Sequence, residues 1–224
     1  MDRVALLLSL KLALATTFVL LVAGIPIAAW IAFSRRRWKF LVEAVVALPL
    51  VLPPTVLGLC VLVALGPRSP LGRFCEAATG RGLVFTFEGL LLASVLYSLP
   101  FAVQPFASAF ASVEASLLEA SWCLGASRAG TFLRVVLPLS RRGLVTGAVL
   151  SFAHTLGEFG VVLMVGGNIP GLTRTASIAI YDDVQALDYG AAGATALVLL
   201  AVSLTVLLVT YALRRDVRGT APWR

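Results

Sequence analysis

Residues 189–213, YGAAGATALVLLAVSLTVLLVTYAL, run for 25 residues without a charged side chain. A helix needs about 20 such residues to cross the roughly 30 Å hydrocarbon core of a bilayer. In lipid every backbone N–H and C=O must find a partner inside its own element, which favours a helix over an open strand. The stretch therefore predicts a membrane-spanning helix.

Three other stretches have the same character, at residues 12–33, 44–67 and 89–113, and a fourth, at residues 143–173, is interrupted by His154 and Glu158. Hydrophobic residues make up 59% of the chain and charged residues only 13%, with a mean hydropathy of +0.97. This composition excludes an ordinary water-soluble domain and a disordered chain. The predicted fold class is all-α: a polytopic bundle of five transmembrane helices in a single domain over residues 1–224.

The N-terminal residues 1–10 have the composition of a signal peptide, but Lys11 interrupts the apolar run and no small-residue cleavage site follows convincingly. We expect an uncleaved first helix that is preceded by an interfacial stretch. A sixth span in this region is the alternative.

The net charge of +7 is distributed unevenly over the connecting segments. Twelve of the 18 basic residues lie in segments 34–43, 112–142 and 214–224, whereas loop 174–188 carries one Arg and three Asp. Because cytoplasmic loops are enriched in Lys and Arg, the N-terminus is predicted outside and the C-terminus in the cytoplasm. The charge is thus a topology signal, and no nucleic-acid partner is expected. The twelve are Arg35, Arg36, Arg37, Lys39, Arg128, Arg134, Arg141, Arg142, Arg214, Arg215, Arg218 and Arg224.

Segment 112–142, SVEASLLEASWCLGASRAGTFLRVVLPLSRR, is the most informative loop. Ser116 and Glu119 match a capping box, which predicts a short helix over residues 117–124. Gly125 suits the left-handed residue that ends a helix, and a second amphipathic stretch at residues 132–137 is expected to stop at Pro138. These residues fit either a protruding lever or an ordinary interfacial linker.

The same segment resembles the EAA loop of ABC-importer permeases. The similarity rests on Glu119-Ala120-Ser121, on Gly125 after three intervening residues, and on Val135 and Leu137-Pro138 after nine more. Only Ser121 departs from the usual Ala. In that family the loop forms a coupling helix that docks on a cytoplasmic ATPase. The resemblance implies that the ATPase-coupling residues are Glu119, Ala120, Gly125, Ala126 and Ser127.

The stretch 143–173 contains two ionisable residues, His154 and Glu158, four positions apart and thus expected on one helix face. Ionisable residues inside a membrane usually face the bundle interior and often mark a pathway. The pair fits a metal site, a proton relay or a packed polar contact at the pore or subunit interface.

Gly157 and Gly160 are expected to allow close helix contact. Pro53 and Pro54 interrupt the second stretch and fit either a pathway-lining break or a packing kink.

Residues 154–160, HTLGEFG, 166–171, GGNIPG, 173–175, TRT, and 48–56, LPLVLPPTV, resemble molybdate permeases of the oxyanion-importer group. Sulfate or tungstate import is the alternative. The resemblance covers roughly residues 5–215. It implies an inner-membrane homodimer, two ATPase subunits that bind ATP and Mg, and an extracytoplasmic oxyanion-binding protein. The candidate pathway or gate residues are Pro53, Pro54, Thr55, His154 and Glu158.

The chain itself is expected to be no enzyme and to hold no cofactor, because it lacks the phosphate-binding loop pattern of ATPases. An oxyanion calls for hydroxyl and N–H donors, so Glu158 is a poor direct ligand. An intramembrane enzyme using His154 and Glu158 is a rival of another class, but no third ligand or nucleophile stands nearby in sequence. A free-standing channel is a further rival and would have no use for the docking loop.

Overall fold

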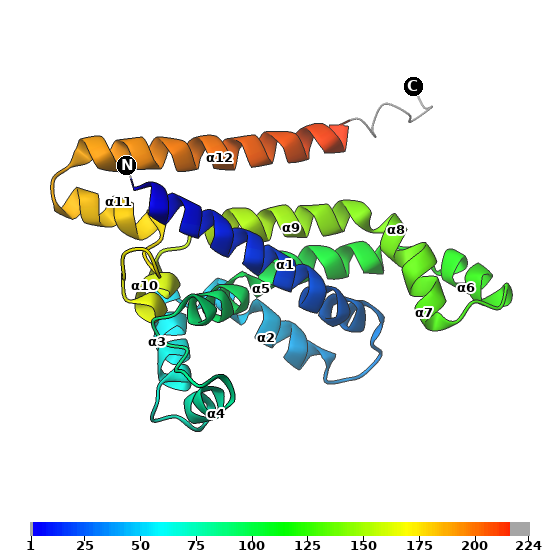
Figure 1. Ribbon diagram of the computed structural model, residues 1–224. Coiled ribbons are helices and arrows are strands. Elements are labelled where there is room, and N and C mark those ends of the chain that lie inside the picture. The colour runs from blue at the N-terminus through cyan, green and yellow to red at the C-terminus, as the bar shows by residue number, and fades with distance from the viewer. Residues whose placement is uncertain (1, 216–224) are drawn as a thin grey trace.

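The computed structural model describes residues 2–215, and all regular secondary structure within them is helical (Figure 1). The predicted all-α class is therefore confirmed; Arg218 and Arg224 lie outside the described residues. The elements are α1 Arg3–Phe33, α2 Lys39–Val51, α3 Pro54–Leu65, α4 Pro70–Thr79, α5 Phe87–Ala111, α6 Ala115–Cys123, α7 Arg128–Thr131, η1 (a π-helical turn) Phe132–Val136, α8 Leu137–Leu139, α9 Arg141–Leu156, α10 Gly160–Gly166, α11 Ala176–Gln185 and α12 Tyr189–Arg215.

Three helices, α1, α5 and α9, form the centre of the bundle (Figure 1). Their largest apolar cluster surrounds Phe106 and Phe110, which are fully buried. The last helix, α12, packs only on one side, against α9 and α11, and leaves large side chains such as Leu197 and Leu200 exposed. An exposed apolar face of this kind suits contact with lipid.

Helix α1 is longer than predicted. It begins at Arg3, where the Asp2 carboxylate accepts a hydrogen bond from the amide of Ala5 at 3.0 Å. Its 31 residues continue unbroken to Phe33, a length of about 46 Å. The N-terminal residues before the predicted span therefore continue the same helix, and their interfacial location stays a prediction. The charge of Lys11 is accommodated within the helix, where its ammonium lies 4.4 Å from the centre of the Phe87 ring.

The second and fourth predicted spans are both broken. The chain bends by 115° between α2 and α3, at the break predicted from Pro53 and Pro54. Residues 143–173 form no single helix, because α9 ends at Leu156 and α10 begins at Gly160. Among the described residues, three helices are long and apolar enough to cross a membrane singly. The number rises to five if α2–α3 and the Arg128–Leu156 pair, bent by 70°, each count as one span.

The connecting segments gather at two ends of the molecule. At one end, residues 32–35, at the end of α1 and just beyond it, line a common cavity with several residues of the segment 115–136. At the other end, the amide of Ala176 at the start of α11 donates to Ser9 Oγ of α1 at 2.8 Å. Figure 1 shows α6 and α7 at the first end, and α11 beside the N-terminus at the second. Helices α4 and α11 were not predicted by the loop analysis.

Candidate functional site

The two helix breaks touch each other. Pro53 and Pro54 carry no amide hydrogen and cannot donate to the carbonyl groups of Pro49 and Leu50 one turn earlier, so α2 ends there. The other break, between α9 and α10, lies against this point. A Cβ atom added at Gly160 would lie 2.8 Å from Cβ of Pro54, so only glycine permits this approach. The predicted close contact is confirmed at Gly160.

A cavity of about 490 Å³ opens where the breaks meet. Four of the predicted pathway residues line it: Pro54, Thr55, His154 and Glu158. Pro53 does not line the cavity. Four helices therefore contribute, α3, α5, α9 and α10, because Tyr97 of α5 also lines the wall. The remaining lining residues are Gly157, Phe159, Gly160, Leu163 and Met164.

Helix α5 supplies residues that the sequence analysis missed. Oγ of Ser98 lies 2.9 Å from Nδ1 of His154 and 2.9 Å from Oγ1 of Thr155. The His154 ring is also held between two aromatic rings, with centroids 4.7 Å from Tyr97 and 3.9 Å from Phe101. Ser94, Tyr97 and Ser98 follow a three- and four-residue spacing in an apolar stretch, a signal that could have identified this face.

Glu158 lies on the break rather than on α9. Helix α9 ends two residues earlier, so the expectation that His154 and Glu158 share one helix face is wrong. The two instead meet through the cavity that both line. Glu158 is only 4% exposed, and neither carboxylate oxygen has a hydrogen bond of ordinary geometry among the described residues.

The wall of this cavity is mostly apolar and carries a few polar side chains. Residues 2–215 contain no group of three His, Cys, Asp or Glu side chains that could hold a metal ion. A pair such as His154 and Glu158 leaves a zinc ion short of the usual three or four protein ligands. The hydroxyl groups of Thr55 and Tyr97 can instead form hydrogen bonds with a molecule in the cavity.

The predicted coupling segment forms a protruding pair of short helices. Helix α6 ends at Cys123, and Gly125 turns the chain with φ of 82°, the left-handed conformation that was predicted. Ser127 caps α7, with its Oγ accepting from the Gly130 amide at 3.1 Å. A hydroxyl pair at 2.9 Å, Ser121 with Thr131, joins the two helices. The two short helices are therefore linked to each other and form one unit.

The predicted docking residues occupy different parts of this unit. Glu119 and Ala120 are exposed on α6, whereas Ala126 is half-buried and donates its amide to the carbonyl of Ser121 at 3.1 Å. Gly125 and Ser127 form the turn. Exposed residues on α6 are thus available to a partner, while the turn residues set the angle between the helices.

Two details of this segment differ from prediction. The capping box does not form, because α6 begins after Glu114 and Ser116 donates to the Glu114 carboxylate at 3.3 Å. The second helix also continues past Pro138 and ends at Leu139. Here Leu137 donates to the carbonyl of Phe132, a π-helical bond that widens the turn ahead of the proline. The chain then bends by 70° at Ser140 into α9.

Comparison with known proteins gives a consistent assignment. A family model described as the inner membrane component of binding-protein-dependent transport systems matches residues 24–219. The molybdenum transport system permease protein ModB of Azotobacter vinelandii is 50% identical over 218 residues, covering 97% of this chain and 96% of that protein. A probable sulfate transport system permease protein, cysT of Prototheca wickerhamii, is 34% identical over 201 residues, or 90% and 78% of the two chains.

A solved structure supports the fold. A bacterial alginate ABC transporter, in complex with an alginate pentasaccharide-bound periplasmic protein, superimposes with a TM-score of 0.72 over 96% of this chain and 80% of that chain, at 18% identity. The two relatives are both named as transport permeases. The chain therefore belongs to the family of inner membrane components of binding-protein-dependent transport systems, as a multi-pass membrane protein.

Proposed function

We propose that this chain is the permease subunit of an ABC-type importer for molybdate. The observation that carries the proposal is the 50% identity to a molybdenum transport permease over nearly the full length of both chains. The 34% identical sulfate permease makes sulfate import the second candidate. Tungstate resembles molybdate in charge and shape and is the third anion to test.

The proposed topology has five membrane crossings, with the N-terminus outside and the C-terminus in the cytoplasm, in one domain over residues 1–224. The positive-inside rule supports it, and so does the arrangement of loops at two ends. Segments 34–38 and 112–142, both rich in Arg, meet at one end, whereas Ser9 and Ala176 meet at the other. In this topology α6 and α7 face the cytoplasm.

The translocation pathway is proposed to run past the two helix breaks and to be completed by a second copy of the chain. Backbone groups freed at a break can contact a solute only where they line a cavity, and the 490 Å³ cavity meets that condition. A buried carboxylate repels a dianion, so we assign Glu158 to the gate or to helix contacts. Thr55 and Tyr97 are better placed to donate hydrogen bonds.

The partners follow from the coupling segment. We propose that α6 docks on one of two cytoplasmic ATPase subunits, which bind ATP and Mg and perform the hydrolysis, and that this chain needs no cofactor. An extracytoplasmic oxyanion-binding protein delivers the anion; the structural neighbour crystallised with its periplasmic protein supports such a partner. Surrounding lipid covers faces such as that of α12.

Uptake of radiolabelled molybdate tests the proposal. The chain would be expressed with its neighbouring ATPase and binding protein in cells that lack molybdate import. ATP-dependent uptake that excess sulfate fails to suppress supports a molybdate importer. Uptake of labelled sulfate with no uptake of molybdate identifies a sulfate permease instead, and uptake of neither anion contradicts both assignments.

A further inference from the structure

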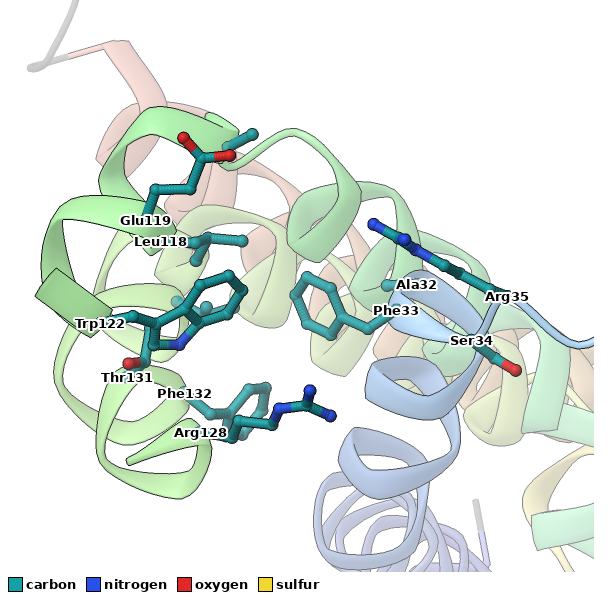
Figure 2. Close-up of a pocket in the computed structure, with 12 residues that line it drawn as sticks. Ala32, Phe33, Ser34, Arg35, Leu118, Glu119, Trp122, Arg128, Thr131 and Phe132 are labelled. Carbon is teal, nitrogen blue, oxygen red and sulfur yellow. The ribbon is translucent and has the colours of Figure 1, made fainter. Parts of the chain in front are cut away.

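A second cavity, of about 780 Å³, lies between the end of α1 and the helices of the coupling segment. Its walls are of two kinds. Aromatic and aliphatic side chains line it, with Phe33 on one side and Leu118, Trp122 and Phe132 on the other (Figure 2). Phe33 and Trp122 remain 43% and 47% exposed, a large area of aromatic surface to leave open. The cavity thus has room for an amphiphilic ligand.

Two arginines give this cavity its charge. Arg35, just after α1, and Arg128, the first residue of α7, both line it and both are exposed. Among residues 2–215, neither forms an ion pair, and that includes none with Glu119, which lines the same cavity. Two guanidinium groups with no carboxylate partner suit a phosphate group, which Arg binds through paired N–H donors.

The neighbouring residues place the cavity at the level of a membrane surface. Trp30 and Trp38, which flank Phe33 and Arg35 in the sequence, pack with ring centroids 5.0 Å apart, and the Arg36 guanidinium lies over the Trp38 ring at 5.5 Å. Tryptophan and arginine at the end of a spanning helix are typical of the membrane–water interface. Arginine clusters on the cytoplasmic side of spanning helices attract anionic lipid headgroups.

We propose that this cavity binds the headgroup of an anionic phospholipid of the cytoplasmic leaflet. Arg35 and Arg128 hold the phosphate, while Phe33, Trp122 and Phe132 contact the glycerol and the upper acyl chains. The lipid then bridges α1 and the coupling segment. The inference rests on the proposed topology, which puts this end of the bundle in the cytoplasm.

Native mass spectrometry of the purified transporter, with the subunits that accompany it, tests the site. Phosphatidylglycerol and phosphatidylcholine are titrated separately. The wild-type chain is expected to prefer phosphatidylglycerol, and the double variant Arg35→Gln/Arg128→Gln is expected to lose about twenty-fold in affinity for it. The matched control, Arg37→Gln/Arg134→Gln, removes one charge from each of the same two segments outside the cavity and keeps the preference.

Several results would overturn the proposal. One is unchanged phosphatidylglycerol binding in the cavity variant; another is equal loss in both double variants, which indicates diffuse attraction to the two segments. Displacement of the lipid by millimolar inorganic phosphate identifies a free-anion site. Loss of ATPase co-purification with lipid binding intact assigns the cavity to the ATPase contact.

A second variant guards against misfolding. Arg35→Lys/Arg128→Lys keeps both charges and is expected to retain most of the preference for phosphatidylglycerol. A loss of phosphatidylglycerol binding in this variant, together with a lowered melting temperature, would also count against a specific site. Molybdate uptake is measured in parallel on the wild-type complex. Absence of uptake contradicts the proposed function and leaves the lipid result to stand by itself.

Discussion

Gly160 of α10 and Pro54 of α3 lie so close that a methyl group on the glycine would come within 2.8 Å of Cβ of the proline. This contact joins the two breaks, and the cavity with His154 and Glu158 opens beside it. Neither residue can move without shifting a helix end, because the proline ring is rigid and Gly160 begins α10. The contact therefore sets the geometry of the proposed pathway.

Replacement of Gly160 with Ala is expected to lower stability by about 1–3 kcal/mol, because the added methyl group has no space. Gly157→Ala is the matched control: it has no atom closer than 3.8 Å to an added Cβ. Thermal unfolding of the purified proteins compares them. Equal melting temperatures for the two variants would show that the breaks are free to separate.

The Ser98 hydroxyl holds His154 and Thr155 together, so Ser98→Ala is expected to cost about 1–3 kcal/mol and to reduce uptake. The loss arises because the buried Thr155 hydroxyl and the half-buried His154 ring lose their shared partner. Ser112→Ala, at the exposed end of the same helix, is the control and is expected to have little effect. Wild-type stability and uptake in Ser98→Ala would show that the rings of Tyr97 and Phe101 suffice to hold His154.

The sequence predicted the fold class and the first break well, for a clear physical reason. Long uncharged stretches have only the helix available in lipid, and Pro53-Pro54 removes two consecutive amide donors. The 115° angle was beyond prediction, because it depends on Leu57 and Val61 of α3 packing against Val161 and Val165 of α10.

The sequence analysis missed the second break because its residues are also typical of a continuous, closely packed helix. Glycines in an apolar stretch are typical of helix packing, so Gly157 gave no sign that the helix ends there. Only in three dimensions does Phe159 leave the helical region, with φ −125° and ψ −59°. The same limit explains Tyr97: an aromatic residue in an apolar helix gives no sign of which cavity it faces.

Glu158→Gln is expected to alter the rate of uptake or the assembly of the complex and to leave anion preference unchanged. The carboxylate is buried and suits a gate or helix contact better than an anion ligand. Uptake of labelled molybdate is measured with sulfate and tungstate as competitors. A changed order of preference would show that Glu158 contacts the substrate.

Gly125→Ala is expected to weaken coupling, because φ of 82° costs a residue with a Cβ atom about 1–2 kcal/mol and the turn between α6 and α7 will shift. Gly80→Ala carries the same strain, at φ 73°, after α4 and far from the coupling segment, so it controls for backbone strain. Co-purified ATPase and uptake are both measured. A normal result for Gly125→Ala would support an ordinary linker.

Glu119→Lys, an exposed charge reversal on α6, is expected to uncouple transport as well.

Reporter fusions test the proposed orientation. A reporter fused after Arg218 is expected to show a cytoplasmic location, and one joined after Asp2 an external one, because five crossings put the two ends on opposite sides. A third fusion within α4, after Ala78, is expected outside, since α4 follows the second span. Fusions at Asp2 and Arg218 that report the same side would require an even number of crossings. If the Asp2 fusion reported the cytoplasm and the Arg218 fusion the outside, the Arg-rich segments 34–43 and 112–142 would lie outside. That result would contradict the charge distribution on which the coupling proposal depends.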